Sequence, residues 1–232
     1  MQQYYAQHKK MFVAVDCIIF GWDEGQLKLL ILKRDFEPAK GKNSLIGGFV
    51  RENESLDEAA RRILFELTGL SDIYLEQLNA YGEVNRDPGE RTISVAYFAL
   101  LKIQNLDPEY VRGHGANWVH ISKLPKLIFD HNLMVQKAIR RLRRRAKSEP
   151  TGFELLPKKF TLPQLQGLYE DIYQMKFDNR NFRKKILSMN ILKKLNEKDK
   201  SCSKKGAYFY KFDKQKYDRF LQNGFQFDVY LD

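Results

Sequence analysis

The sequence predicts an α+β protein made of two domains. Short apolar runs dominate residues 11–121, whereas residues 161–189 carry apolar positions at helical spacing in two successive segments. The charge is also divided: residues 1–139 hold 17 Lys/Arg against 18 Asp/Glu, a net charge of −1, and residues 140–232 hold 23 against 11, a net charge of +12. A break containing Pro and Gly lies between the two parts, so we expect domains at 1–148 and 149–232.

The composition limits the class of protein. Of the 232 residues 43% are hydrophobic, which is enough for packed cores and argues against global disorder. No apolar run approaches the roughly 20 residues that span a bilayer, and the first ten residues contain no apolar signal core. Cys17 and Cys202 lie far apart in the chain, so neither a disulfide framework nor a cysteine zinc site is indicated. We expect a cytoplasmic protein without a cofactor.

The first domain is expected to begin with a β-hairpin, because two apolar runs at 11–22 and 26–33 flank a short Asp-Glu-Gly turn. A helix is expected between Ser55 and Gly69, since Ser55 and Glu58 have the spacing of a capping box and Gly69 supplies a stop. The remaining expected elements are strands at 43–51, 73–83, 92–101 and 117–121 and a helix at 134–147 that is strongly basic from Arg140 to Arg145.

A glycine–helix segment at 48–70 carries the most specific motif of the chain. It reads GFVRENESLDEAARRILFELTGL. Its spacing resembles the signature of the Nudix family, in which a loop and a helix place carboxylates around divalent cations. The matching positions are Gly48, Glu54, Arg62, Leu64, Glu66, Gly69 and Leu70. The resemblance implies that the N-terminal domain is a Nudix α/β/α sandwich.

Two positions depart from that signature, because Ile63 and Leu67 stand where it has glutamate. Hard divalent cations need several oxygen ligands, and in such enzymes they activate water for attack at phosphorus. Only Glu66 remains of the three helix glutamates, so we expect no catalytic residue and no metal ligand in this domain. The alternative is a magnesium-dependent Nudix hydrolase of a nucleoside diphosphate derivative such as ADP-ribose.

A Nudix sheet without metals keeps a pocket beside its helix, and charged residues near strand ends are candidates to line it. Asp16 lies in an apolar run and needs a partner if it is buried; a structural salt bridge, for example with Lys33, is the other interpretation. The charged turn at 85–91 also fits a solvated loop. Charged donors and acceptors beside aromatic walls suit a sugar or nucleotide-sugar. The expected ligand-binding residues are Asp16, Lys33, Arg34, Phe36, Phe49, Arg86, Asp87, Glu90 and Arg91.

The basic second domain has the element order of a winged helix-turn-helix: a helix from Thr161, a turn at 175–178, a second helix at 179–189, and two strands around a Lys/Ser loop. Asp178 is a natural N-cap of the second helix. The residues of that helix expected in the core are Phe182, Ile186, Leu187 and Met189. The residues expected to contact DNA are Asn179, Arg180, Asn181, Arg183, Lys184 and Lys185 in the helix and Lys204 and Lys205 in the wing.

The segments FTLPQLQGLYEDIY and DNRNFRKKI resemble the winged-helix domain of Nudix-related bacterial transcription factors, and the resemblance extends from residue 11 to about residue 215. One branch of that family senses ADP-ribose and controls NAD metabolism, and another senses arabinose and controls pentose use. The stretches EPTGFELLPKKFTL and LIFDH resemble the pentose branch, so we expect a pentose such as L-arabinose ahead of a nucleotide-sugar. The resemblance implies a homodimeric repressor or activator on a palindromic operator, in which the effector changes the spacing of the two winged helices.

A further alternative concerns the arginine run at 140–145. Such a run on an exposed helix fits an RNA-binding or membrane-surface protein. It equally fits phosphate contacts made by a DNA-binding protein between its two domains.

Overall fold

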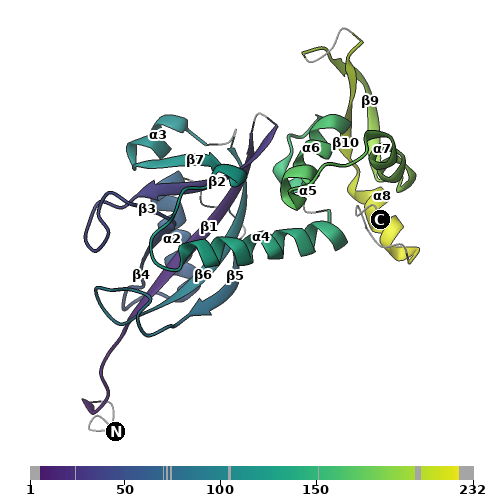
Figure 1. The fold of residues 1–232 in the computed structure, drawn as a ribbon. Coiled ribbons are helices and arrows are strands. Elements are labelled where there is room, and N and C mark those ends of the chain that lie inside the picture. Colours follow the sequence, from purple (N-terminus) through teal and green to yellow (C-terminus); the bar gives the residue numbers. More distant parts are fainter. Residues whose placement is uncertain are drawn as a thin grey trace.

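The computed structural model describes residues 6–23, 25–69, 71, 73, 75–103, 106–150, 152–201 and 205–224. An N-terminal sheet domain and a C-terminal helical domain lie end to end and are joined along helix α4 (His131–Ser148), as Figure 1 shows. Helices and strands occur in both parts, which confirms the predicted α+β class.

The N-terminal domain is built on one seven-stranded sheet with the order β3-β2-β1-β6-β5, in which β4 also pairs with β1 and β7 with β2. The strands are β1 (Phe12–Asp23), β2 (Gln26–Lys33), β3 (Asn43–Ser44), β4 (Ile46–Phe49), β5 (Leu75–Tyr81), β6 (Thr92–Lys102) and β7 (Ala116–His120). The predicted hairpin is present, since β1 and β2 pair antiparallel with Asp23 opposite Gln26. β1 also pairs with β6 in parallel, so β1 is a central strand with both faces buried.

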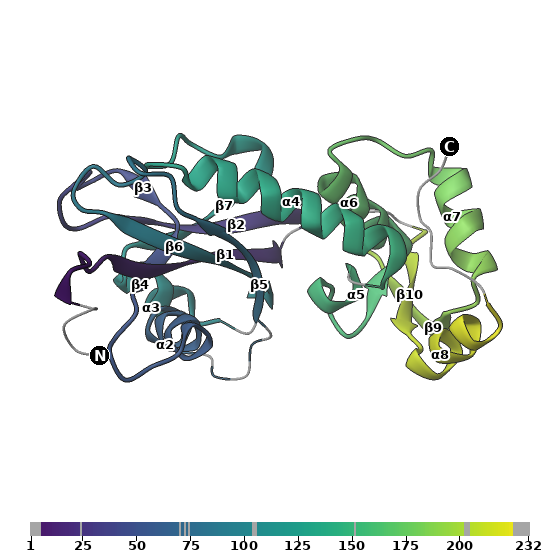
Figure 2. The same cartoon turned by 90° about the horizontal axis from the view of Figure 1, so that it is seen from below.

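Side chains along β1 alternate between the two faces of the sheet. Ile18 and Phe20 pack in the core that contains α4, whereas Cys17 and Ile19 pack in the core that contains α2 (Leu56–Thr68). Figure 2 shows α2 and α4 on opposite sides of the sheet. The predicted α/β/α arrangement is therefore present.

Helix α2 begins and ends as the sequence predicts. Ser55 and Glu58 form a capping box, and Gly69 has the left-handed φ of 71° with its N–H donating to the Phe65 carbonyl. Glycine suits this position because it has no Cβ to clash. A short helix, α3 (Pro108–Gly113), begins at the N-cap Asp107. Periodicity does not predict α3, because six residues are too few to show it.

The C-terminal domain has the predicted winged helix-turn-helix order. Its elements are α5 (Gly152–Leu155), β8 (Phe160–Thr161), α6 (Leu162–Tyr173), α7 (Asn179–Ser188), β9 (Leu192–Asp199), β10 (Ala207–Phe212) and α8 (Lys214–Gln222). A 3-10 turn, η2 (Ile121–Lys123), follows β7 in the N-terminal domain. The three strands form a sheet in the order β8-β10-β9, in which β9 and β10 make the wing. In the described part of the chain, no helix is long and apolar enough to cross a membrane.

One continuous apolar core crosses the junction between the domains. It includes Trp22 at the end of β1, Leu142 of α4 and Leu168 of α6. At Gly167 a Cβ would lie 3.7 Å from the Trp22 ring, so α6 packs closely on the sheet. Polar contacts add to this packing: the Leu27 N–H donates to the Asp171 carboxylate at 2.7 Å.

Candidate ligand pocket and nucleic-acid interface

The loop and helix of the glycine–helix motif keep their structural ion pair. Arg62 donates through Nε and Nη2 to the Glu54 carboxylate at 2.8 and 2.6 Å, and also to the Phe49 carbonyl at 3.1 Å. The hydrogen bond from Arg62 lowers the pKa of Glu54 from 4.5 to about 2. Arg51 and Arg62 both lie within 3.4 Å of the Glu66 carboxylate. Glu54 and Glu66, the two glutamates that match the signature, therefore both form ion pairs with arginines.

The two positions that depart from the signature, Ile63 and Leu67, lie in an apolar core. Ile63 and Leu67 are only 6% and 7% exposed and pack with Val15 and Cys17 of β1. A Cβ added at Gly48 would lie only 3.0 Å from the end of the Ile63 side chain, so Ile63 packs closely against this glycine. Within the described residues, no group of three His, Cys, Asp or Glu side chains is arranged to hold a metal.

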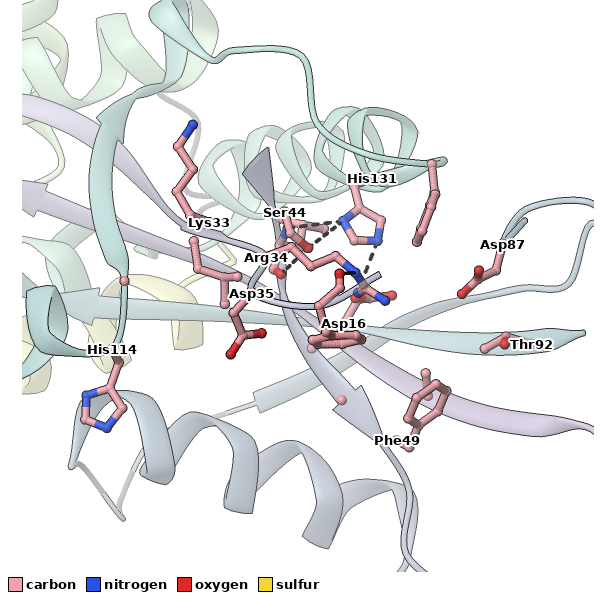
Figure 3. A pocket seen from close by; sticks show the side chains of 18 of the residues that line it. Asp16, Lys33, Arg34, Asp35, Ser44, Phe49, Asp87, Thr92, His114 and His131 are labelled. Atoms are coloured by element: carbon pink, nitrogen blue, oxygen red, sulfur yellow. Dashed lines mark hydrogen bonds and ion pairs between the residues drawn. The ribbon is translucent and has the colours of Figure 1, made fainter. Parts of the chain in front are cut away.

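A cavity of about 540 Å³ opens near the start of β4, where Asp16 of β1 and His131 of α4 line it (Figure 3). Residues from several strands, from α3 and α4 and from the segments between them line it: Ala14, Asp16, Leu32, Lys33, Arg34, Asp35, Phe36, Ser44, Leu45, Gly47, Gly48, Phe49, Arg86, Asp87, Thr92, Gly113, His114, Gly115, Phe129 and His131. We call the buried set Asp16, Ser44, Arg86 and His131 the pocket floor. We call Lys33, Arg34, Phe36 and Phe49 the pocket rim.

Asp16 is the centre of the pocket floor and is only 7% exposed. Its carboxylate accepts a hydrogen bond from the Ser94 hydroxyl at 2.5 Å, and it lies 3.7 Å from Arg86 Nη2 and 3.6 Å from His131 Nε2. A Cβ at Gly47 would collide with this carboxylate, so glycine is required where β4 crosses it. The alternative partner Lys33 makes no ion pair with Asp16.

Arg86 is held by a second carboxylate. It donates through Nε and Nη2 to Asp130 at 2.9 and 2.7 Å, a bidentate pair in which the Arg86 side chain is 3% exposed. Burial works against the charge on Arg86, but the hydrogen bonds and negative charge of Asp130 outweigh it, so the pKa of Arg86 is raised. Two carboxylates therefore share one buried guanidinium.

His131 has its tautomer fixed by the backbone. Its Nδ1 accepts the Leu45 N–H at 3.1 Å, so the neutral ring carries its proton on Nε2, which faces Asp16. Burial lowers the pKa of His131 below its usual 6.5, against the opposing effect of Asp16. The pocket floor thus presents carboxylate acceptors together with N–H donors, which suits a ligand rich in hydroxyl groups.

The pocket rim combines cations with aromatic rings. The Arg34 guanidinium lies 3.7 Å from the centre of the Phe36 ring and 5.6 Å from that of Phe129. Phe129 has a left-handed φ of 48°, a strained conformation for a bulky residue that is found at functional sites. Lys33 also lines the cavity (Figure 3).

The structure brings most of the sequence-predicted pocket residues together. Asp16, Lys33, Arg34, Phe36, Phe49, Arg86 and Asp87 line the cavity. Glu90 and Arg91 do not line it. Arg91 donates instead to the carbonyls of Gly82 and Glu83, where it fixes the loop before β6. Phe129 and His131 also line the cavity but were not predicted, and neither was Asp130, which pairs with Arg86; the Asp-His pair at the start of α4 was a usable signal.

The exposed face of α7 carries the predicted polar residues. Asp178 caps the helix by accepting the Asn181 N–H at 2.9 Å. Arg180, Asn181, Arg183 and Lys184 are exposed, and Lys185 is half-buried. Asn179 is also exposed, but its side-chain oxygen accepts a hydrogen bond from the amide of the buried Gln166 at 2.6 Å. The expectation that Leu187 lies in the core is wrong, because this side chain is 38% exposed. Leu187 follows the buried Ile186 directly, so it points away from the buried face of the helix.

The wing presents more lysines than the sequence analysis names. The exposed ring of Tyr208 lies 3.7 Å from Lys194 Nζ and 4.6 Å from Lys198 Nζ, which holds two ammonium groups on the β9 face. Lys205 is exposed at the end of the wing. Lys204, which is also expected to contact DNA, lies outside the described residues.

Most of the arginine run of α4 serves the protein itself. Arg141 and Arg145 form ion pairs with Glu76 of β5. Arg143 donates to the Ile172 carbonyl of α6 at 2.7 Å. These contacts explain the run as an internal element and weaken the interpretation of a free RNA-binding or membrane-binding surface.

Comparison with known families matches both parts of the chain. Residues 10–142 match the NUDIX domain, and residues 152–212 match the NrtR DNA-binding winged helix domain. The ADPR responsive transcriptional repressor NtrR of Acinetobacter baylyi is 32% identical over 226 residues, 94% of this chain and 90% of its own length. The ADP-ribose pyrophosphatase of Methanocaldococcus jannaschii is 34% identical over 131 residues, 55% of this chain and 73% of its own length.

Two solved structures give the same assignment. Shewanella oneidensis NrtR complexed with a 27mer DNA is 27% identical and superposes with a TM-score of 0.74, covering 93% of this chain and 97% of that one. The NUDIX domain of the same protein complexed with ADP ribose is 28% identical with a TM-score of 0.51, covering 61% of this chain and 99% of that one. None of these relatives is described as binding a pentose, so the expected preference for the arabinose branch is not supported.

Proposed function

The chain belongs to the family of NrtR-type transcriptional regulators, in which a Nudix domain is joined to a DNA-binding winged helix, and from this premise we propose that it is a repressor whose operator binding is controlled by ADP-ribose. The observation that carries the proposal is the cavity, which combines a cationic rim with a floor of hydrogen-bond acceptors and donors that suits hydroxyl groups. The A. baylyi relative, which spans nearly the whole chain, is described as ADPR responsive.

The two parts of the cavity suit the two parts of the ligand. Lys33 and Arg34 of the pocket rim carry positive charge for a diphosphate, and the aromatic rings of Phe36 and Phe49 can stack on a base. At the pocket floor the carboxylate of Asp16 would repel a phosphate but accepts hydrogen bonds from ribose hydroxyls. We therefore place the terminal ribose at the floor and the diphosphate at the rim.

The Nudix domain acts in this proposal as a sensor and not as a hydrolase. Metal-assisted attack at phosphorus needs carboxylates at positions 63 and 67, and those positions carry buried apolar side chains. The rival function is ADP-ribose hydrolysis, which the relative from M. jannaschii is named for. Magnesium-dependent release of AMP by purified protein, well above the rate without protein, would establish that rival.

The winged helix is proposed to bind a palindromic operator as a homodimer. The N-terminal residues of a recognition helix contact base edges in the major groove, where Arg bonds guanine and Asn bonds adenine. Arg180, Asn181 and Arg183 are exposed on the first turns of α7 and are assigned this role. Lys184, Lys185 and Lys205 are assigned to phosphates, whereas Asn179 is assigned to orienting the helix through Gln166.

The central test measures DNA binding with and without ligand. An operator duplex is selected by the protein from a random-sequence library, and its Kd is measured by fluorescence anisotropy. We expect saturating ADP-ribose to raise that Kd at least fivefold, a typical coupling between two sites, and ADP, which lacks the terminal ribose, to have little effect. Failure to select any sequence, or a Kd unchanged by ADP-ribose, would contradict the proposal.

A matched pair of variants tests the ligand placement. Asp16→Asn removes the acceptor charge at the pocket floor, and we expect roughly tenfold weaker ADP-ribose binding by calorimetry, the loss expected for a charged hydrogen bond. Glu90→Gln removes a carboxylate that lies close in sequence to Arg86 but does not line the cavity, and its affinity should match the wild type. Equal losses in both variants would remove Asp16 from the ligand site.

A further inference from the structure

Helix α4 begins differently from the other capped helices of the described chain. At α2, α3, α6, α7 and α8 the N-cap side chain accepts a backbone N–H from the first turn. At α4 the N-cap residue is Asp130, yet its side chain makes no such hydrogen bond. Its carboxylate is instead held by Arg86 of the pocket floor in the bidentate pair. The start of α4 therefore depends on a residue that lines the ligand cavity.

The backbone of Asp130 agrees with this difference. Its ψ is 11°, whereas the side-chain-capped N-caps have extended ψ values, for example 169° at Ser55 and 123° at Asp178. A residue caps a helix only when its backbone is turned out of the helical region. If Asp130 were to cap α4, its ψ would have to rotate to an extended value, and the first turn of α4 would move with it.

The other end of α4 packs against the DNA-binding domain. Leu142 and Ala146 are fully buried in the core that includes α6. Arg143 donates to the Ile172 carbonyl at 2.7 Å, and the Tyr173 hydroxyl donates to the Arg143 carbonyl at 3.2 Å. A displacement at the first turn of α4 is therefore transmitted to α6 through a rigid helix of 18 residues.

We propose that the Arg86–Asp130 pair is the link between ligand binding and DNA binding, with Asp130 as a positioning residue that acts through α4. This inference rests on the proposed function and adds its mechanism. Hydroxyl groups of the ribose at the pocket floor engage Arg86 and draw it away from Asp130. The freed carboxylate caps the first turn of α4, the helix shifts, and the orientation of the winged helix changes.

The variant Asp130→Asn separates this link from ligand binding. An asparagine keeps the capping oxygen but lacks the charge that holds Arg86, so the variant should resemble the ligand-bound protein. We expect its operator Kd to be raised at least fivefold without ligand and to change less than twofold on adding ADP-ribose. Asp107→Asn is the matched control, because Asp107 caps α3 in the ordinary way and does not touch Arg86. Its response to ADP-ribose should equal that of the wild type.

A measurement on the unaltered protein gives a direct readout. Capping by Asp130 would place a hydrogen bond on the N–H of Asn132, the second residue of α4, because the Leu133 N–H already donates to the Asp130 carbonyl at 2.9 Å. Amide hydrogen exchange at Asn132 should slow at least threefold when ADP-ribose is added. Unchanged exchange, or an Asp130→Asn protein that still responds like the wild type, would overturn the inference. A wild type that shows no ADP-ribose response would instead overturn the proposed function.

Discussion

His131 of the pocket floor is expected to make the stability of the fold depend on pH. Its Nδ1 accepts the Leu45 N–H, so a second proton on the ring would remove that hydrogen bond, and burial lowers the pKa of His131 below 6.5. In the unfolded chain the imidazole has its ordinary pKa near 6.5. As pH falls below about 6.5, the unfolded state therefore takes up the proton before the folded state does, and the free energy of unfolding decreases until the folded pKa is reached.

The resulting prediction is that the melting temperature falls between pH 7.5 and 5.5 by more in the wild type than in His131→Asn. An asparagine oxygen can accept the Leu45 N–H at either pH, so the contribution of this site becomes independent of pH. His114→Asn, at an exposed position, should keep the wild-type pH dependence. Identical pH profiles for all three proteins would show that His131 is not the titrating group.

Residue-level prediction succeeded where a motif specified side chains and failed where the fold supplied partners. Ile63 and Leu67 were identified as departures because the segment resembles the Nudix signature. The partners of Asp16 could not be predicted in this way. Ser94 comes from β6, Arg86 from the loop before β6 and His131 from the start of α4. These are contacts across 70 to 115 residues of sequence, which periodicity does not encode.

At the scale of elements, α7 is the part of the proposed function that is easiest to test. Arg180→Ala and Arg183→Ala should each weaken operator binding by about tenfold, in line with roughly 1–3 kcal/mol for a good base contact. Both residues are remote from the cavity, so stabilisation by ADP-ribose in a thermal shift assay should be unchanged. Lys123→Ala, in the N-terminal domain, is the control for loss of general charge. If both arginine variants bind like the wild type, α7 is not the recognition helix.

The packing of α6 on the sheet depends on a single small residue. A Cβ at Gly167 meets the Trp22 ring at an ordinary contact distance of 3.7 Å, but a larger side chain has no room. Gly167→Ala should leave the stability within about 1 kcal/mol, because helix propensity improves, whereas Gly167→Leu should lose about 1–3 kcal/mol through overpacking. Urea unfolding measures both, and equal stability of the two variants would contradict the tight junction.

Element prediction was best where a helix start and stop were both present. Ser55, Glu58 and Gly69 gave the bounds of α2, whereas α4 starts at His131, three residues before the predicted start at Met134. The early start was hidden because Asp130 and His131 read as polar loop residues. Their partners lie elsewhere in the fold, at Arg86 and at the Leu45 backbone.

At the scale of the whole molecule, the two domains share a core and should unfold together. Trp22, Leu142 and Leu168 belong to one apolar cluster, so separating the domains would expose buried surface on both sides. We expect a single calorimetric transition with a van't Hoff enthalpy close to the calorimetric one. Two resolved transitions would indicate that the junction contributes little. The uneven charge predicts two domains but not this junction, because the apolar residues of α4 look alike in the sequence whichever domain they face.

The close contact between Gly167 and Trp22 has a consequence for building chimeric regulators. Joining the Nudix domain of one such protein to the winged helix of another between α4 and α5 would not give a stable protein. The two domains pack through complementary surfaces, which would not match between different parents. A functional hybrid would have to carry α4, the tip of the β1–β2 hairpin and the facing side of α6 from the same parent. The interchangeable part is therefore the cavity lining other than Arg86, which can be redesigned for a new inducer while the packing surfaces between the domains are kept.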